Sequence, residues 1–146
     1  MAYILNFLRS APPPRLSPEN PLSVDVPAAQ LPLDPVLYIT SVVDSVAPLL
    51  KLRPVRGRAG GGVTILVPSP LPVRQRRRVA FNWILGAAEK RKNNGSGRYT
   101  FPQRVAEEII AIAEGRSAAW EKRDQLYKQA VNVRSNISSK KMSFRR

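Results

Sequence analysis

The sequence predicts a mainly α-helical bundle with a projecting two-stranded β-hairpin arm. Three observations lead to this fold class. Apolar residues recur at spacings of three and four in several separate segments, which is the helical period. One β-branched stretch follows a glycine-rich run, as in a hairpin. A chain of 146 residues is long enough for one domain with its own core, so residues 1–146 are predicted to form a single domain.

A first, short helix is predicted in residues 1–10, where Ile4, Leu5 and Leu8 share one face. Three consecutive prolines then stop it. The following residues, 11–34, are rich in proline and show neither the helical nor the strand period. We therefore interpret them as an extended insertion outside the core, which a short linker could replace.

A second helix is predicted at residues 35–50. Asp34 can cap its first turn, and Pro35 suits that turn because its missing N–H would have no partner there. Pro48 is expected to tighten or stop the last turn. The residues that recur at spacings of three and four are Val36, Ile39, Thr40, Val43, Val46, Ala47 and Leu50.

Residues 51–68 predict the β-hairpin arm. Its first strand carries cations where a buried strand would carry apolar residues, and its second strand is the β-prone run Val63–Val67. Pro54 and Pro68 suit a ribbon with free edges. The tip is predicted at Gly60, Gly61 and Gly62, which would let a backbone approach a partner closely. We expect this arm to lie outside the core.

Three further helices are predicted at residues 73–92, 101–114 and 118–135, followed by a flexible basic tail at 136–146. Thr100 and Gln103 form a capping box before the second of these helices, Gly115 can close it, and Ser117 can cap the third. The predicted core residues of these two helices are Phe101, Val105, Ile109, Ile112, Trp120, Tyr127 and Ala130. Trp83 and Trp120 are interpreted as core residues rather than as platforms for bases.

The charge of the chain points to a polyanionic partner. Its formal net charge is +14 and its sequence pI about 11.3. Residues 1–50 contain two cations and four acids, whereas residues 51–146 contain the other 22 cations and six acids. We therefore assign polyanion binding to the last two-thirds of the chain.

The residues that are missing argue against an enzyme. The chain has no cysteine and no histidine, so zinc fingers, thiol chemistry, His-ligated metals and histidine-based triads are excluded. Glu107 and Glu108 are adjacent on a predicted helix and point about 100° apart, so they do not share a site. Glu108 and Glu114 are assigned to a solvated face or to salt bridges. No cofactor and no metal are predicted, and no apolar run is long enough to span a membrane.

Arginines cluster where a helix disfavours them. The helix at 73–92 begins with Arg74, Arg76, Arg77 and Arg78, although a helix N-terminus carries partial positive charge. Phosphates held there by backbone N–H groups and arginines together would justify this placement. For the run at 90–92, a solvated helix C-terminus is an equally good interpretation. The candidate nucleic-acid-binding clusters are Arg53, Arg56 and Arg58; Arg74, Arg76, Arg77 and Arg78; Lys90, Arg91 and Lys92; and Lys122 and Arg123.

A series of short motifs follows one another along the chain in a characteristic order. They are the glycines from Gly60, Val67-Pro68, Arg76-Arg77, Ala80–Ile84, Ala87-Ala88, Lys90-Arg91, Arg104–Ile109, Ala113-Glu114, Ala118-Ala119 and Lys122–Asp124, with Val42–Val46 upstream. This order resembles the small-subunit ribosomal protein S-seven family. The resemblance implies a helical bundle with a β-ribbon arm and without catalytic activity. It also implies binding to small-subunit rRNA in the head of the subunit, beside neighbouring ribosomal proteins. The arm would reach toward the exit-site tRNA and the mRNA.

The resemblance also implies which residues of this chain correspond to the basic elements of the family. The family's basic hairpin strand corresponds to Arg53, Arg56 and Arg58, and its helix start to Arg76 and Arg77. Its basic last helix corresponds to Lys122, Arg123 and Lys128. Taken with the clusters above, these complete the set of candidate rRNA-binding residues.

Three departures from the family pattern shape the expected location. The family's basic N-terminal arm and first helix have no counterpart, and the first residues resemble the second half of its second helix, so we expect an N-terminally incomplete chain. The proline-rich insertion replaces a short connection, and the C-terminus differs in composition. Such drift with insertions favours a mitochondrial relative, in the matrix on the small ribosomal subunit, over a bacterial or plastid one.

Two other functions fit parts of the sequence. A free-standing basic regulator that binds DNA or RNA is the main alternative, since arginines at a helix start are also typical of DNA-reading proteins. Against it, there is no short helix–turn–helix spacing, and the cations are distributed over several elements. A peripheral membrane protein is the third interpretation. It would need one amphipathic helix with aromatic residues opposite lysines, whereas the basic helix predicted at 73–92 is apolar almost all the way round.

Overall fold

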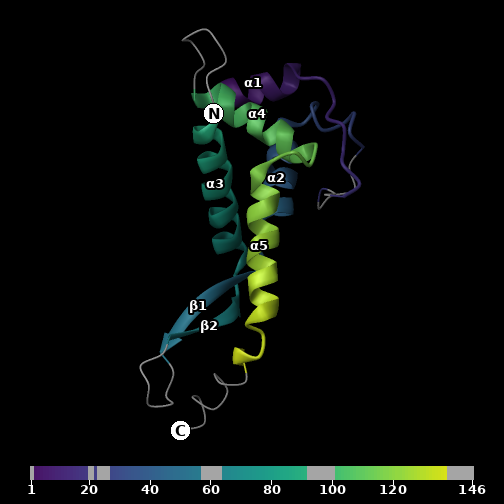
Figure 1. Ribbon diagram of the computed structural model, residues 1–146. Coiled ribbons are helices and arrows are strands. Elements are labelled where there is room, and N and C mark those ends of the chain that lie inside the picture. Colours follow the sequence, from purple (N-terminus) through teal and green to yellow (C-terminus); the bar gives the residue numbers. More distant parts are fainter. Residues whose placement is uncertain (1, 20–21, 23–26, 57–63, 92–100, 138–146) are drawn as a thin grey trace.

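The computed structural model describes residues 2–19, 22, 27–56, 64–91 and 101–137. In chain order its elements are α1 (Ala2–Ser10), α2 (Pro35–Val46), β1 (Leu50–Arg56), β2 (Thr64–Pro70), α3 (Val73–Lys90), α4 (Phe101–Ala113) and α5 (Ala118–Asn132). Figure 1 shows α1 and α4 across one end, α3 and α5 running away from them, and β1 and β2 projecting at the other end. The predicted helical bundle with a two-stranded antiparallel hairpin is confirmed.

The predicted cap of α2 is confirmed, but the prediction of which α2 residues face the core is partly wrong. The carboxylate of Asp34 accepts the backbone N–H groups of Val36 at 3.0 Å and Leu37 at 3.1 Å. The helix ends at Val46, ahead of Pro48. Val36 is 62% exposed, and Thr40 is exposed as well. The side of α2 that packs inward instead consists of Pro35, Tyr38, Ser41, Val42, Val43, Ser45 and Val46.

The turn from α4 to α5 follows the predicted capping. Gly115 adopts a positive φ of 75°, which favours glycine, and the N–H of Arg116 donates to the carbonyl of Ala111 at 2.8 Å. Ser117 Oγ then accepts the N–H of Ala119 at 3.0 Å at the start of α5. The capping box proposed for α4 depends on Thr100, which lies outside the described residues.

The core lies between the five helices. Its buried residues are Leu8, Leu31, Tyr38, Val42, Val43, Val46, Ala47, Ala80, Ile84, Ala88, Val105, Ile109, Ile112, Ala113, Ala119 and Trp120. The indole N–H of Trp120 donates to the carbonyl of Ile112 at 3.0 Å, and Trp83 packs against the cluster while partly exposed. Trp120 is therefore a core residue, as predicted, whereas Trp83 lies at the edge of the core. Phe101 stays outside this core, 38% exposed.

The proline-rich stretch contributes to the core, which corrects the interpretation of residues 11–34 as lying outside it. Leu31 is completely buried within the main cluster, and Pro14 and Pro32 are also buried. Leu22 packs against the same cluster. A periodic pattern detects helices and strands, but a single side chain can anchor an irregular segment without any period. The absence of a period therefore did not exclude burial here.

The second strand of the hairpin contacts the rest of the protein near the middle of the strand. The two strands pair from Leu50 opposite Pro70 to Arg56 opposite Thr64. Val67 is buried to 1% exposure, and Asn136 Nδ2 donates to the backbone carbonyl of Leu66 at 2.9 Å.

The expectation that the whole arm lies outside the core is thus wrong for its second strand, because one face of that strand meets the body of the protein. The predicted glycine tip, Gly60 to Gly62, lies outside the described residues, as does the tail from residue 138. Within the described residues, no helix combines the length and the hydropathy that crossing a membrane requires.

Candidate nucleic-acid interface

The start of α3 presents arginines without a capping side chain. Its N-cap residue, Pro72, makes no side-chain cap hydrogen bond, and the first turn contains no acidic residue. Arg74 and Arg78 are exposed at this end of the helix. Arg76 is partly buried, and its Nε has no hydrogen-bond partner among the described residues. The helix N-terminus therefore combines its own partial positive charge with exposed guanidinium groups.

Arg77 has a partner within the chain. Its Nε and Nη2 donate to the two carboxylate oxygens of Asp44 on α2, each at 2.7 Å. The hydrogen bond to Asp44, reinforced by the carboxylate's negative charge, raises the pKa of the Arg77 guanidinium. The side chain remains 46% exposed. One of the arginines at this helix start is therefore balanced by a carboxylate on α2 and does not need an external anion.

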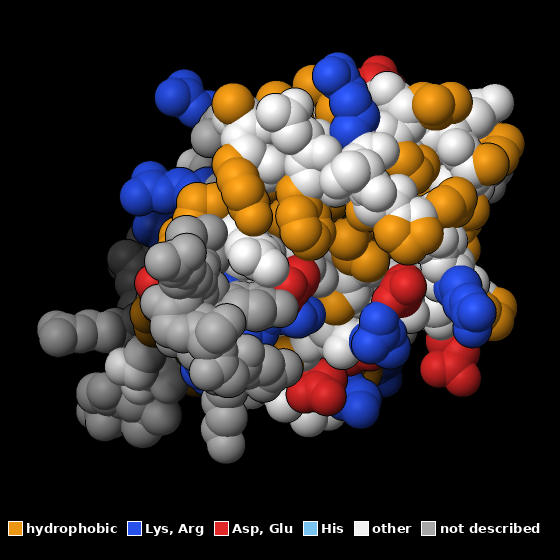
Figure 2. All heavy atoms as spheres, turned by 90° about the horizontal axis from the view of Figure 1, so that it is seen from above, with side chains coloured by type: hydrophobic (Ala, Val, Ile, Leu, Met, Phe, Trp, Pro, Cys, Tyr) orange, Lys and Arg blue, Asp and Glu red, His pale blue; other side chains and the backbone are white. Residues whose placement is uncertain are grey.

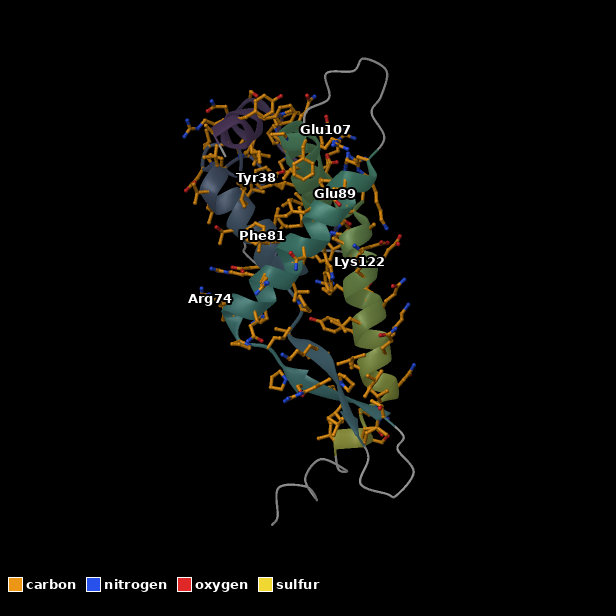
Figure 3. The ribbon with its side chains drawn as sticks, turned by 90° about the vertical axis from the view of Figure 1, so that its left-hand side faces the viewer. Tyr38, Arg74, Phe81, Glu89, Glu107 and Lys122 are labelled. Atoms are coloured by element: carbon orange, nitrogen blue, oxygen red, sulfur yellow. The ribbon has the colours of Figure 1, made fainter. Side chains whose placement is uncertain are left out.

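A stripe of exposed side chains follows one face of α3. Arg74, Arg78, Phe81 and Leu85 are spaced by four, three and four residues, so they share one side of the helix. Phe81 is 43% exposed and Leu85 38% exposed. Figure 3 looks toward this side of the molecule, with Arg74 near one end of α3 and Phe81 farther along it. We call these four residues the α3 stripe.

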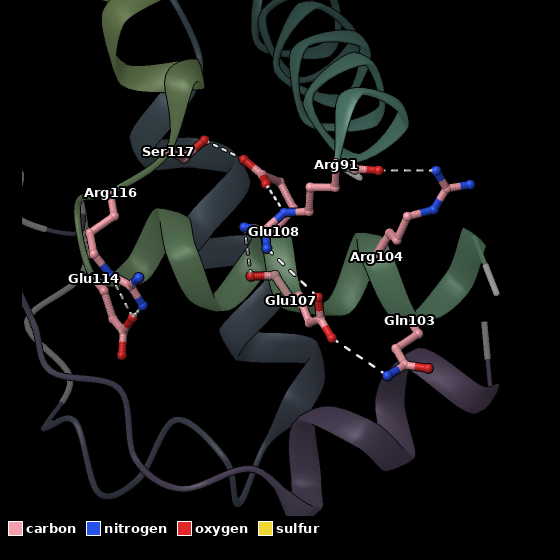
Figure 4. Close-up of polar contacts among 8 residues, drawn as sticks. All are labelled: Arg91, Gln103, Arg104, Glu107, Glu108, Glu114, Arg116 and Ser117. Atoms are coloured by element: carbon pink, nitrogen blue, oxygen red, sulfur yellow. Dashed lines mark hydrogen bonds and ion pairs between the residues drawn. The ribbon is translucent and has the colours of Figure 1, made fainter. Parts of the chain in front are cut away.

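Arg91 is bound into the fold just beyond α3 (Figure 4). Its Nε lies 2.5 Å from Glu108 Oε2 on α4, and its Nη1 lies 3.7 Å from Glu107 Oε2. The other oxygen of Glu108 accepts the hydroxyl of Ser117 at 2.5 Å. Glu108 is buried, so its assignment to salt bridges is confirmed and the alternative of a solvated face is wrong. Glu114 pairs with Arg116 in the same region.

Arg123 is also engaged within the chain. Its guanidinium lies over the ring of Trp120, 4.3 Å from the centroid, and 6.0 Å from the ring centroid of Tyr127. Its Nη1 donates to the carbonyl of Ser45 at 2.9 Å, which joins α5 to the end of α2. The side chain is 23% exposed. The sequence pattern assigned Arg123 to a cluster of RNA-binding cations, and its packing role within the fold was not predicted. The signal for that role was present, because aromatic residues three positions before and four positions after an arginine on a helix indicate such contacts.

The remaining candidates differ in exposure. Lys122 is partly buried, and only the backbone of Arg56 is described. Arg58 and Lys92 lie outside the described residues. The exposed candidates are Arg53, Arg74, Arg77, Arg78, Lys90 and Lys128, of which Arg77 is paired with Asp44. Within the described residues, no group of three or more acidic side chains is placed to hold a metal ion.

The end of the bundle formed by α1 and α4 has a different chemistry. Figure 2, which looks onto this end, shows hydrophobic side chains gathered across it with a few cations around them. Tyr3, 49% exposed, stacks on Phe7 with ring centroids 6.3 Å apart. This apolar end contrasts with the basic start of α3 near the hairpin.

The sequence of this chain is similar to those of known proteins. Residues 23–134 match the family model described as Ribosomal protein S7p/S5e. The small ribosomal subunit protein uS7m of Neurospora crassa is 53% identical over 140 residues, which are 95% of this chain and 45% of that protein. The small ribosomal subunit protein uS7 of Francisella tularensis subsp. novicida is 39% identical over 88 residues, 60% of this chain and 51% of that protein. The chain thus spans about half the length of the curated relatives it matches.

Proposed function

Because this chain belongs to the ribosomal protein S7p/S5e family, we propose that it is a non-catalytic structural component of the small ribosomal subunit in the mitochondrial matrix. It binds and organises the rRNA of the subunit head, and other small-subunit proteins are its neighbours. The hairpin extends toward the mRNA and the exit-site tRNA. The mitochondrial location rests on the 53% identity to uS7m, against 39% to the bacterial uS7 over a shorter stretch.

The observation that carries the RNA-binding part of this proposal is the start of α3. Arg74 and Arg78 are exposed on one face of a helix N-terminus that has no capping side chain and no acidic first turn. Exposed guanidinium groups bind phosphate oxygens with paired N–H donors, and a helix N-terminus favours the same anion. The net charge of +14 adds attraction to a polyanion over the whole molecule.

The experiment compares two double variants with the same loss of charge. Arg74→Gln with Arg78→Gln removes two cations from the α3 stripe, whereas Arg9→Gln with Arg15→Gln removes two exposed cations from the other end of the chain. Arg77 is left alone because its pairing with Asp44 would confuse binding with folding. The readouts are co-sedimentation with mitochondrial small ribosomal subunits in high salt and binding to small-subunit rRNA over a range of salt concentrations.

We expect the α3 variant to weaken rRNA binding more than the matched control. Each lost phosphate contact should reduce the slope of log affinity against log salt by about 0.7 for a single strand to about 0.9 for a duplex, so two contacts reduce it by about 1.4 to 1.8. Equal losses in the two double variants would show that only net charge matters and would remove α3 from the interface. Failure of the wild-type chain to sediment with small subunits would reject the ribosomal proposal itself.

A further inference from the structure

We propose that Phe81 is a stacking platform for an unpaired base of the RNA whose phosphates contact Arg74 and Arg78. This inference rests on the proposed function and adds the kind of nucleotide that the α3 stripe recognises. The bound element would be a single-stranded loop, bulge or junction strand, with its base on the Phe81 ring and its backbone along the arginines.

The position of Phe81 is not explained by the core. The residues through which α3 packs inward are Ala80, Ile84, Ala87 and Ala88. Phe81 is not among these residues; it lies beside this inward face, one turn after Arg77, and is 43% exposed. An exposed aromatic ring next to cations offers a surface on which a planar base can stack.

The surroundings of Phe81 favour RNA as that partner. A helix rises about 1.5 Å per residue, so Phe81 follows Arg78 by about 4.5 Å along the axis, on the same side. A nucleotide with its phosphate on Arg78 would therefore have its base beside the ring. Along α3 the nearest acidic residue is Glu89, beyond Leu85, and Asp44 on α2 is occupied by Arg77. The stripe thus combines cations with an aromatic face, as in sites that bind single-stranded nucleic acid.

The same geometry selects an unpaired base. In an A-form duplex the faces of the bases are stacked on one another, and the ring of Phe81 could not reach them. Single-stranded loops and bulges present base faces that aromatic side chains can cover. Phosphate contacts by Arg74 and Arg78 would fix the position of the strand, and stacking on Phe81 would discriminate single-stranded from paired RNA.

The test uses the full chain, three substitutions at Phe81 and a neighbouring control. Phe81→Ala removes the ring, Phe81→Leu keeps an apolar side chain without a ring, and Phe81→Trp keeps an aromatic face. Leu85→Ala truncates the other exposed apolar residue of the stripe. The probes are a single-stranded RNA of about twelve nucleotides in mixed sequence, within the usual site size for such proteins, and a duplex of the same sequence. Circular dichroism monitors folding of each variant.

We expect Phe81→Ala and Phe81→Leu to bind the single strand between about fivefold and about 100-fold more weakly, the range for losing one stacked base. Phe81→Trp and Leu85→Ala should bind it within about twofold of wild type, and duplex binding should change little in all four. Since stacking releases no counterions, the salt slope of Phe81→Ala should match that of wild type, unlike that of the double arginine variant.

Other outcomes would overturn the inference in distinguishable ways. Wild-type affinity of Phe81→Leu for the single strand would mean that an apolar contact suffices and that no base stacks. Normal binding of Phe81→Ala to both RNAs, together with its loss from small subunits, would assign the stripe to a protein neighbour. In both cases rRNA binding through Arg74 and Arg78 would still stand. Absence of wild-type binding to both probes and to small-subunit rRNA would reject the proposed function as well.

Discussion

Arg91 and Glu108 join the end of α3 to the middle of α4, with 2.5 Å between Arg91 Nε and Glu108 Oε2. The same carboxylate receives the hydroxyl of Ser117, whose Oγ also caps α5. One buried carboxylate thus connects three helices. This arrangement gives Arg91 a role in folding, and it explains why the cation is placed where α3 ends.

Removing Glu108 should therefore destabilise the fold. We expect Glu108→Ala to lower the free energy of unfolding by about 2 to 4 kcal/mol, since the Arg91 Nε–H and the Ser117 hydroxyl lose their shared acceptor. Urea denaturation measures this loss. The control is Glu107→Ala, because Glu107 is more exposed and 3.7 Å from Arg91, and there we expect about 1 kcal/mol or less. Similar losses in both variants would contradict a special role for Glu108.

Leu31 should behave as a core residue despite its proline-rich surroundings. It is completely buried, whereas Leu16 in the same stretch is 40% exposed. We expect Leu31→Ala to lower the free energy of unfolding by about 2 to 5 kcal/mol through loss of buried apolar surface and a residual cavity. Leu16→Ala should change it by about 0.5 kcal/mol or less. Thermal and urea denaturation of the two variants give the comparison, and a neutral Leu31→Ala would restore the view of this stretch as replaceable.

The hydroxyl of Tyr38 should contribute nothing to stability at neutral pH. Its oxygen is buried and has no hydrogen-bond partner among the described residues. Replacement by phenylalanine removes the unsatisfied group and keeps the ring, so Tyr38→Phe should leave the free energy of unfolding unchanged or raise it by about 1 kcal/mol. A loss of stability in urea denaturation would reveal a hydrogen bond to ordered water.

Tyr38 should also make the fold sensitive to alkali. Burial, followed by the charge of Glu114, raises the pKa of the Tyr38 hydroxyl above its ordinary value of 10.0. Above pH 10.0 the unfolded side chain loses its proton while the folded one keeps it, so stability falls as the pH rises from there. The decline should be shallower in Tyr38→Phe, and Tyr3→Phe, at an exposed position, is the matched control. Identical alkaline profiles for wild type and Tyr38→Phe would contradict this assignment.

Arg123 should not be replaceable by lysine. The planar guanidinium covers Trp120 and reaches the carbonyl of Ser45, whereas an ammonium group cannot do both. We expect Arg123→Lys to lower the free energy of unfolding by about 1 to 2 kcal/mol, as measured by denaturation in urea. The control Lys122→Arg on the same helix should change it by about 0.5 kcal/mol or less. A fully stable Arg123→Lys would mean that only charge matters at this position, as for a cation that simply faces phosphate.

The parts of the fold that were predictable from the sequence are those decided by neighbouring residues. The caps at Asp34 and Ser117 and the turn at Gly115 depend on chemistry within a few positions of each helix end. The hairpin follows from β-branched residues and prolines in the same way. The burial of Leu31 depends instead on packing against helices that are distant in the chain, and a local pattern carries no information about it.

The same distinction applies to the candidate interface. A run of cations predicts a basic region, but it does not say which side chains face solvent. Arg77 pairs with a carboxylate 33 residues earlier and Arg91 with one 17 residues later, and only the assembled fold brings these partners together. The exposed arginines of the α3 stripe can be distinguished from these paired arginines only when the positions of α2 and α4 are known.

The packing of α1 against α4 determines when the chain can finish folding. Most of the sequence separates these two helices, yet Leu8 of α1 is completely buried in the common core. A helix of nine residues is marginal on its own in water. During synthesis, α1 can meet α2 early, but the part of its apolar face that packs against α4 stays uncovered until α4 has emerged. Closure of this long loop makes the final assembly slow, and the nascent chain is most prone to aggregate in that interval.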